Sequence, residues 1–448
     1  MPQQKYTVVS LFSGAMGLDI GLERSGRFRL LACVEKDAPT RETIAANRDA
    51  GRIGSPDTRI YGDINALTPE QLMADLGVKP GEIDVVVGGP PCQSFSTAGK
   101  RRTVQDPRGT LLWRYLAFIA ALKPRFFLME NVRGLVSAAL RHRPIAERPK
   151  KGGPPLAEDE EPGSVMRAFA ADLSALPDTR YRVDGFEVNS VNYGAPQIRE
   201  RVLFIGNRLG QQVEFPRPTH AAPWAESSKG GPQGDLFGPK RSLPWSTLGE
   251  ALAGLEDPEP VVLDFSPRKK RFLSMVPPGS NWRSLPEDVQ RESMGGAWHA
   301  KGGRSGWWRR LTFDLPCPTL ITMPNHASTS LCHPTETRAL SLKEYARIQE
   351  FPDDWHFHGT VSQRYRQVGN AVPVRLGAIA GETIVAALDG AGAAPATDAE
   401  DFRLVYVQSH VRTRKWYSAG KTHVWKDGKQ GDNPTYSDPV TQEKVRLP

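Results

Sequence analysis

Short apolar runs alternate with segments of helical periodicity over residues 1–206. The apolar runs are rich in β-branched and aromatic residues, which favours buried strands over helices. The predicted strands are residues 5–12, 28–34, 83–87, 125–129 and 201–206, and residues 111–122 form a predicted helix between two of them. This alternation predicts an α/β domain with a doubly wound, mostly parallel sheet that is covered by helices on both faces.

The alternation is interrupted twice along the chain. Residues 137–163 are rich in Pro, Gly and charged residues, which predicts an exposed insertion. Residues 207–337 contain many Pro, Gly and Trp residues without a βα pattern, so we predict a second, smaller and irregular domain there. Helical patterns in residues 338–390 predict a return to the first domain. Residues 391–448 begin as a linker and continue as a basic tail whose short β patterns suggest a small β appendage.

Composition excludes several classes of protein. The chain has 448 residues, of which 39% are hydrophobic and 24% charged, as in a globular protein with two or three domains. It has no continuous apolar run of membrane-spanning length and no signal-peptide pattern, so we expect neither a membrane span nor export. The net charge of +8 favours a polyanionic partner. The four cysteines form no CxxC pair, so we expect no disulfide framework and no metal site.

Small and acidic residues follow the predicted strands. In an open α/β sheet, ligands bind outside the carboxyl ends of the strands. The turn SGAMG at 13–17 follows the first strand, and Glu35, Asp63, Cys92 and Glu130 follow later ones. Cys92 comes directly after two prolines that stiffen the backbone, which is unusual for a structural cysteine. These strand ends together predict one ligand site that contains a thiol.

The glycine pattern limits the kind of ligand. No GxxxxGK[ST] motif occurs, which excludes a P-loop, and the turn at 13–17 falls short of the three glycines of a dinucleotide fingerprint. A nucleoside with a neutral or positive tail fits this turn better than a dinucleotide does. S-adenosylmethionine is such a ligand.

The chain resembles the bacterial DNA (cytosine-5)-methyltransferases in a series of short motifs. These are FSGAMGLDIGLE (12–23), GDI (62–64), GGPPCQSFS (88–96), RGTLLWRYL (108–116), ENV (130–132), QIRERVLFIG (197–206), RALSLKEYARIQEFPDDW (338–355) and QVGNAVP (367–373). They occur in the family's order and frame most of residues 5–390. Two positions depart from the family pattern. Met16 stands where glycine is frequent, and Lys36 stands where an apolar residue often follows the acid, which puts stacking on the far side of the adenine in doubt.

The resemblance implies a methyltransferase fold and covalent catalysis on cytosine. Carbon 5 of cytosine is a poor nucleophile, so the Cys92 thiolate would add to carbon 6 and push electron density onto carbon 5, which then takes the methyl group. Glu130 would protonate or hydrogen-bond ring nitrogen 3. Arg201 would contact the 2-carbonyl oxygen, and Arg199 would support the same pocket and the cysteine. We expect Asn131 to hold the local turn instead.

The same resemblance implies a set of residues around S-adenosylmethionine. The predicted cofactor residues are Phe12, Gly14, Gly17, Glu35, Asp63, Ile64, Pro91, Leu111, Asn370 and Val372. Among them, Glu35 would hold the ribose and Asp63 the adenine amino group. Plain core packing is the alternative for Phe12.

The resemblance also implies double-stranded DNA as the partner. The target carbon is stacked inside the duplex, so the nucleotide must be flipped out. The predicted DNA-contacting residues are Lys100, Arg101 and Arg102 in a closing loop, and Arg304, Arg309 and Arg310 in a basic, Trp-containing stretch. A solvated basic loop is the alternative for the first group, and a core Trp pair with a basic rim is the alternative for the second.

Three other functions are weighed against cytosine methylation of DNA. A transfer-RNA methyltransferase on the same scaffold is one, but the large 207–337 region favours sequence readout in DNA. A non-catalytic DNA-binding relative would have lost Cys92, Glu130 or the arginines. A cysteine hydrolase would need a histidine near a strand end. We expect a monomer in the bacterial cytoplasm, at the nucleoid, which either marks the genome alone or protects it from a restriction endonuclease that is a functional but not a physical partner.

Overall fold

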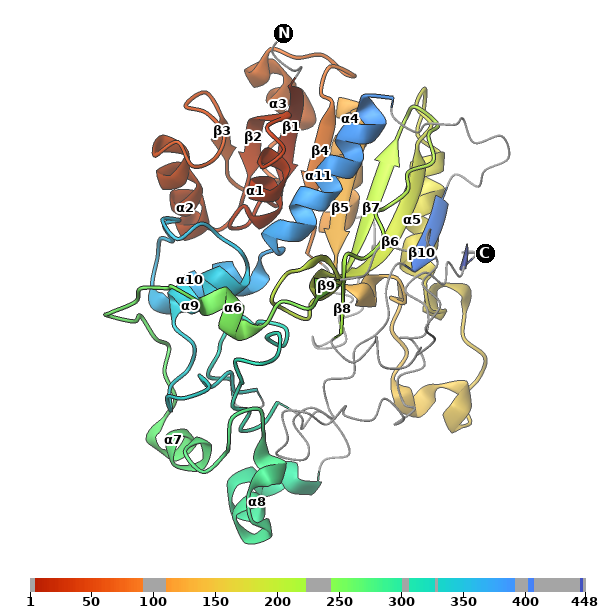
Figure 1. Cartoon of the computed structure of the whole chain (residues 1–448). Helices are drawn as coiled ribbons and strands as arrows, with labels where there is room; N and C mark the ends of the chain where they lie inside the picture. The colour runs from red at the N-terminus through yellow and green to blue at the C-terminus, as the bar shows by residue number, and fades with distance from the viewer. Residues whose placement is uncertain are drawn as a thin grey trace, which may run out of the picture.

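A computed structural model describes residues 5–91, 110–222, 243–299, 306–326, 329–390, 402–406 and 444–445. The described strands β1 to β7, β10 and β11 form one twisted sheet, and the helices lie against it and below it (Figure 1). A further pair of two-residue strands, β8 (His220–Ala221) and β9 (Leu243–Pro244), lies outside that sheet.

The central strands follow the order β3-β2-β1-β4-β5-β7-β6. Their bounds are β1 (Tyr6–Leu11), β2 (Phe28–Val34), β3 (Arg59–Tyr61), β4 (Val85–Gly88), β5 (Phe126–Asn131), β6 (Arg182–Asn189) and β7 (Glu200–Asn207). Strands β1 to β5 pair in parallel, whereas β7 pairs antiparallel with both β5 and β6. The mostly parallel, doubly wound sheet that the alternation predicted is confirmed.

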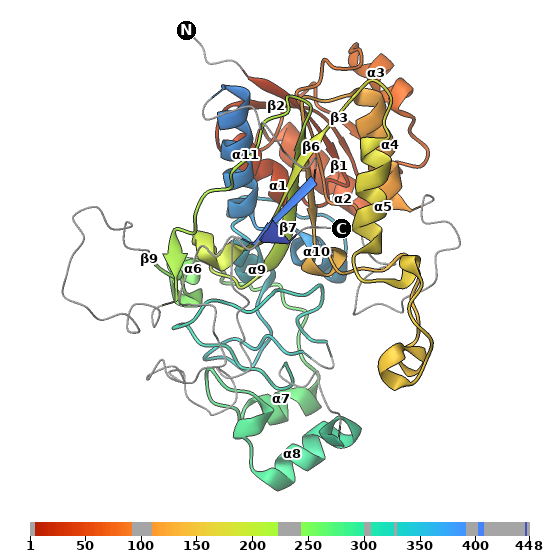
Figure 2. The ribbon, with the colours of Figure 1, turned by 90° about the vertical axis from the view of Figure 1, so that its right-hand side faces the viewer.

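Helices cover both faces of the sheet, which is why its central strands are apolar along their whole length. The first face is covered by α1 (Gly17–Glu23), α2 (Ala38–Asp49) and α11 (Val374–Leu388), and the second by α3 (Pro69–Leu76), α4 (Leu111–Leu122) and α5 (Ser164–Ser174). Figure 2 shows α11 and the α4–α5 pair on opposite sides of the strands. Every residue of β4 and β5 is buried.

Two glycines let α1 and α11 touch. A Cβ atom at Gly21 would lie 2.3 Å from the backbone oxygen of Val374, and one at Gly377 would lie 2.4 Å from the backbone oxygen of Leu18. A larger residue at either position would push the two helices apart. This close contact holds the first turn of α1 at the carboxyl edge of the sheet.

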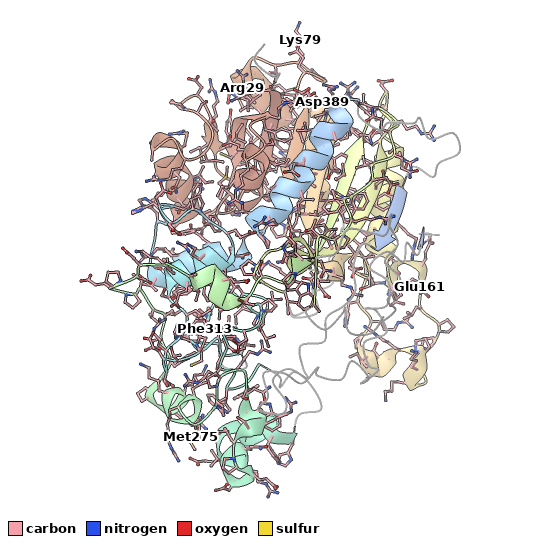
Figure 3. The ribbon with its side chains drawn as sticks, in the orientation of Figure 1. Arg29, Lys79, Glu161, Met275, Phe313 and Asp389 are labelled. Carbon is pink, nitrogen blue, oxygen red and sulfur yellow. The ribbon has the colours of Figure 1, made fainter. Side chains whose placement is uncertain are left out.

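Residues of the predicted second domain lie beyond the carboxyl edge of the sheet. They include α6 (Leu248–Leu252), α7 (Pro267–Leu273) and α8 (Glu287–Met294), which lie below the strands in Figure 1. A separate apolar cluster there includes Phe272, Trp282 and Trp308. Figure 3 shows Met275 and Phe313 in this region, on the opposite side of the molecule from Arg29, Lys79 and Asp389. The domain bounds themselves stay predictions.

The chain then returns to the sheet through α9 (Leu342–Ile348), α10 (Val361–Asn370) and α11. By length and composition alone, the helical stretch Val361–Leu388 is long and apolar enough to cross a membrane, although charged and polar residues interrupt it. Within this fold 56% of its most apolar 18-residue window is buried, and α11 packs on α1, as a core helix does.

The predicted insertion at residues 137–163 lies wholly within the described residues. Residues 137–163 contain the short turns η3 (Ile145–Glu147), η4 (Pro149–Lys151) and η5 (Glu158–Glu160), and an ion pair joins Arg143 to Glu160. Ile145 is 67% exposed, which fits an exposed insertion.

The described part of the tail joins the main sheet. Strand β10 (Phe402–Tyr406) pairs in parallel with β6, and β11 (Lys444–Val445) pairs antiparallel with β10. The β pattern predicted at the start of the tail is thus a strand of the main sheet, where β10 covers the edge that β6 would otherwise leave unpaired. The rest of the tail lies outside the described residues.

Candidate active site

A cavity of about 470 Å³ opens at the carboxyl edge of the sheet. It is lined by the turns after β1, β2, β3, β4 and β5, by the start of β7, and by the junction between α10 and α11. All the predicted cofactor residues line it, namely Phe12, Gly14, Gly17, Glu35, Asp63, Ile64, Pro91, Leu111, Asn370 and Val372. Glu130, Arg199 and Arg201 line it too. Cys92 directly follows the lining residue Pro91 but lies outside the described residues.

The turn after β1 has an unusual backbone. Phe12, Gly14 and Met16 have φ angles of 56°, 54° and 71°, which lie in the left-handed region that favours glycine. A non-glycine residue there costs about 1–2 kcal/mol. Glycine would adopt this conformation without strain, so Met16 is a costly residue at its position. Phe12 is half-buried; it packs against the apolar core and also lines the cavity, so its cofactor contact stays a prediction.

Glu35 fastens this turn to β2. Its Oε2 atom accepts a hydrogen bond from the backbone N–H of Gly14 at 2.9 Å, and its Oε1 atom accepts one from Asp37 at 2.8 Å. Burial raises the pKa of the Glu35 carboxyl, and these two hydrogen bonds oppose that rise. Each carboxylate oxygen has a second lone pair, so the group can still accept from ligand hydroxyls.

Asp63 forms an ion pair with Lys36, one of the two residues that depart from the pattern of the resembled family. Lys36 Nζ lies 2.8 Å from Asp63 Oδ2, and the backbone N–H of Asn65 donates to Oδ1 at 3.0 Å. The hydrogen bond from Lys36 lowers the pKa of Asp63, which keeps the group an acceptor. The sequence analysis missed this pair, although an acid and a lysine at two adjacent strand ends are a usable signal.

Glu130 and Arg201 form an ion pair inside the cavity. Glu130 lies near the end of β5, and Arg201 lies at the start of β7; their Oε1 and Nε atoms are 2.6 Å apart. Both side chains are only 10–12% exposed. Because β7 runs antiparallel to β5, its first residues lie at the edge where β5 ends. The two residues were expected to contact separate atoms of the base, and the structure shows that they also contact each other.

The turn between β4 and Cys92 packs against Glu130. A Cβ atom at Gly89 would lie 3.0 Å from Glu130 Oε2, so only glycine leaves that carboxyl undisturbed. Asn131 Nδ2 donates to the backbone oxygen of Pro90 at 2.9 Å, and its Oδ1 accepts from Val132 N–H at 2.9 Å. Asn131 therefore holds the local turn, as expected. The backbone that leads to Cys92 is fixed from both sides.

Arg199 links segments that line the cavity. It is 2% exposed, and its guanidinium donates to the backbone oxygens of Leu320 at 3.0 Å and Gly369 at 2.7 Å. Burial lowers the pKa of Arg199 well below its usual value, and the charge of Arg201 acts in the same direction. Arg199 thereby connects β7 to the end of α10, where Asn370 lines the cavity.

Two buried glutamines extend this connection and were not predicted. Gln197 Nε2 donates to Gln349 Oε1 at 2.9 Å, and Gln349 Nε2 donates to the backbone oxygens of Val368 at 2.7 Å and Ala371 at 3.1 Å. Both glutamines are fully buried. Their presence in the motifs at 197–206 and 338–355 was the available signal.

The predicted DNA-contacting residues are only partly described. Lys100, Arg101, Arg102 and Arg304 lie outside the described residues. Arg309 and Arg310 are buried, with 7% and 4% exposure.

Arg310 donates to the backbone oxygens of Leu273 at 2.8 Å and Glu336 at 3.0 Å. Its donors are used inside the second region, beside the buried Trp308, so the structure does not place it on a DNA-facing surface. This matches the alternative of a core Trp cluster for the stretch.

Three of the four cysteines lie in the described part of the chain. Cys33, Cys317 and Cys332 are free thiols and buried. Burial raises the pKa of Cys317 to about 12 and that of Cys332 to about 11, which makes both poor nucleophiles. Within the described ranges, no group of three or more His, Cys, Asp or Glu side chains is placed to hold a metal ion.

Comparisons with known proteins identify the family of the chain. A family model described as C-5 cytosine-specific DNA methylase matches residues 6–386. The type II methyltransferase M.Sau96I of Staphylococcus aureus is 35% identical over 381 residues, which covers 85% of this chain and 76% of that protein. M.Eco47II of Escherichia coli is 32% identical over 386 residues, which covers 86% of this chain and 80% of that protein.

A solved structure is also similar to this chain. A candidate DNA modification methyltransferase encoded within an E. coli prophage superposes with a TM-score of 0.53 at 25% identity, over 86% of this chain and 100% of that one. The chain therefore belongs to the C-5 cytosine-specific DNA methylase family and is a DNA (cytosine-5-)-methyltransferase.

Proposed function

We propose that this enzyme methylates carbon 5 of cytosine within one specific double-stranded DNA sequence, with S-adenosylmethionine as the cofactor and Cys92 as the covalent nucleophile. The observation that carries the proposal is which residues line the cavity. It brings the predicted cofactor residues together with the Glu130–Arg201 pair and with the turn that ends at Pro91, one residue before Cys92.

The described residues fit S-adenosylmethionine by shape and by polarity. A Cβ atom at Gly17 would lie 2.2 Å from the backbone oxygen of Val372, so glycine lets the first turn and the α10–α11 junction close around one slot. Glu35 and Asp63 supply acceptors for ribose hydroxyls and the adenine amino group, and Phe12 supplies an apolar wall. S-adenosylmethionine, when bound, supplies the methyl group.

The protein groups act on the cytosine ring. The Cys92 thiolate forms a bond to carbon 6, and a proton passed to nitrogen 3 by Glu130 neutralises the charge that develops there. Arg201 orients the Glu130 carboxyl and donates to the 2-carbonyl oxygen. Once carbon 5 takes the methyl group, nitrogen 3 returns its proton to Glu130. A base then removes the proton from carbon 5 and the bond from sulfur to carbon 6 breaks, which restores the thiolate and the aromatic ring.

The remaining assignments concern DNA and biological context. Lys100, Arg101, Arg102 and Arg304 contact the phosphate backbone, and residues 207–337 read the sequence. The enzyme works as a monomer on nucleoid DNA in the cytoplasm. The two type II relatives support a role in restriction and modification, in which a separate endonuclease shares the recognition sequence.

The proposal is tested by trapping the covalent adduct. Purified enzyme is mixed with S-adenosylmethionine and a duplex that carries 5-fluorocytosine at the methylated position, which bisulfite sequencing of DNA from expressing cells first identifies. Carbon 5 then cannot lose a proton, so a denaturation-resistant protein–DNA adduct should accumulate.

Two variants and one substrate exchange complete the test. Cys92→Ala should bind the duplex but form no adduct, whereas Cys317→Ala, the matched control at a buried thiol, should form it. Turnover by Cys92→Ala, or no adduct with active wild-type enzyme, would refute the covalent mechanism. Methylation of transfer RNA but not of duplex DNA would refute the substrate.

A further inference from the structure

A buried carboxyl group lines the cofactor cavity and has no role in the function proposed above. Asp19 lies in the first turn of α1, is 2% exposed and lines the cavity. Within the described part of the chain, neither of its carboxyl oxygens has a donor in hydrogen-bonding geometry. The Ser10 hydroxyl and the backbone N–H of Asp19 approach the group closely enough to oppose the effect of burial, but burial dominates and raises its pKa to about 7.

The packing of α1 keeps this group where it is. The helix is in contact with α11 through Gly21 and Gly377, so it cannot turn Asp19 outward without separating the two helices. The neighbouring charge that acts on Asp19 is a second acid, Glu23, which raises the pKa further. A buried carboxylate with an acid beside it and no hydrogen-bonded donor is unfavourable, and a cation in the cavity would offset that cost.

The order of the strands shows which part of a ligand Asp19 meets. Glu35 follows β2 and Asp63 follows β3, toward one edge of the sheet. Ser10, the neighbour of Asp19, lies in β1 and pairs with Val87 of β4, in the middle of the sheet. A nucleoside bound by Glu35 and Asp63 would therefore direct its other end toward Asp19.

That other end of S-adenosylmethionine carries three polar groups. The sulfonium is positive but has no hydrogen to donate, and the carboxylate would repel a second carboxylate. The α-ammonium group has a positive charge and three N–H donors, which matches a carboxylate with two open oxygens. We propose that Asp19 binds the α-ammonium group of the cofactor and is the residue that selects for the amino-acid part of the molecule. This inference rests on the proposed cofactor.

The test separates the two ends of the ligand. Binding of S-adenosylhomocysteine, which has the amino-acid part, and of 5′-methylthioadenosine, which lacks it, is measured by calorimetry for the wild type and for Asp19→Asn. The asparagine keeps the size of the side chain but removes its charge. Loss of a charge-assisted hydrogen bond should weaken S-adenosylhomocysteine about tenfold to a hundredfold and change 5′-methylthioadenosine less than twofold. Asp84→Asn, at the opposite edge of the sheet, is the matched control and should leave the ratio unchanged.

Each other outcome has a defined meaning. Equal weakening of both ligands would show that Asp19 only shapes the cavity, and no weakening of either would show that it makes no contact; both overturn the inference. A wild type that binds neither ligand would overturn the proposed cofactor itself. Should Asp19→Asn fail to fold, wild-type binding of the deaminated analogue of S-adenosylhomocysteine decides. An affinity about tenfold to a hundredfold weaker than that for S-adenosylhomocysteine supports the inference, and an equal affinity refutes it.

Discussion

The contact between Gly89 and Glu130 predicts that one added methyl group slows catalysis without unfolding the protein. Gly89→Ala would place its Cβ atom 3.0 Å from Glu130 Oε2, and ordinary contacts of this kind begin at 3.4 Å. The carboxyl would have to move by a few tenths of an ångström. It cannot do so freely, because Arg201 holds the other oxygen at 2.6 Å and both side chains are buried.

The expected magnitude follows from the size of this displacement. A misplacement of about 1 Å at a reacting group can cost about a hundredfold in rate, so a few tenths of an ångström should cost about fivefold to tenfold in kcat. Gly89 does not have a positive φ angle, so alanine adds no backbone strain there. Affinity for S-adenosylhomocysteine should stay within twofold, since Glu130 is not one of the proposed cofactor residues.

Two other glycines supply the controls for a steady-state methylation assay with tritiated cofactor, which measures kcat. At Gly134 the nearest atom to an added Cβ would be 4.0 Å away, so Gly134→Ala should behave as the wild type. At Gly88 the added Cβ would lie 2.4 Å from the backbone oxygen of Leu11 in β1, so Gly88→Ala should lower the melting temperature sharply. A normal kcat for Gly89→Ala would refute the positioning argument. A melting temperature as low as that of Gly88→Ala would show that the substitution disturbs the whole fold and not only Glu130.

Three further predictions concern the same site. Asn131→Ala removes the donor to Pro90 and should destabilise the fold by about 1–3 kcal/mol in urea unfolding, and an unchanged midpoint would contradict that. Iodoacetamide at pH 8 should label Cys92 first in the native protein, because the three described thiols are buried; mass spectrometry that finds one of those three modified first would disprove it. In the cofactor-free protein the pKa of Asp19 is raised to about 7, so the folded state holds an extra proton and loses stability as pH rises from about 4 to 7. Asp19→Asn should therefore be more stable than the wild type at pH 8, with the difference shrinking toward pH 4; urea midpoints with no such convergence would count against it.

Much of the site could be predicted because parallel strands end at one edge of a sheet. Glu35, Asp63 and Glu130 are far apart along the chain, yet each follows an apolar run, and the rule for open α/β sheets brings them together. The structure places all three on one cavity. Asn131 could be assigned to the local turn for a similar reason, since a polar residue at a strand end has backbone groups within reach.

Other features depend on which distant segments become neighbours in the fold. The contact between Glu130 and Arg201 exists because β7 runs antiparallel beside β5, and no local pattern encodes that pairing. The burial of Arg310 depends on carbonyl groups contributed by distant segments, so a basic, Trp-containing stretch looks the same whether it faces DNA or a core. The addition of β10 to the main sheet likewise depends on the edge that β6 offers.

The sequence by itself determined the fold class and the edge of the sheet where the cavity lies, because these follow from periodicity and from residue types at strand ends. The motifs that it shares with the DNA (cytosine-5)-methyltransferases determined the family. Only the tertiary structure decided how the groups are paired and which charges are buried. Asp19 shows the difference: along the chain it is an ordinary acid in the first turn of a helix. It becomes a carboxyl with a raised pKa because two glycines bring α1 and α11 into contact and close it into the cavity.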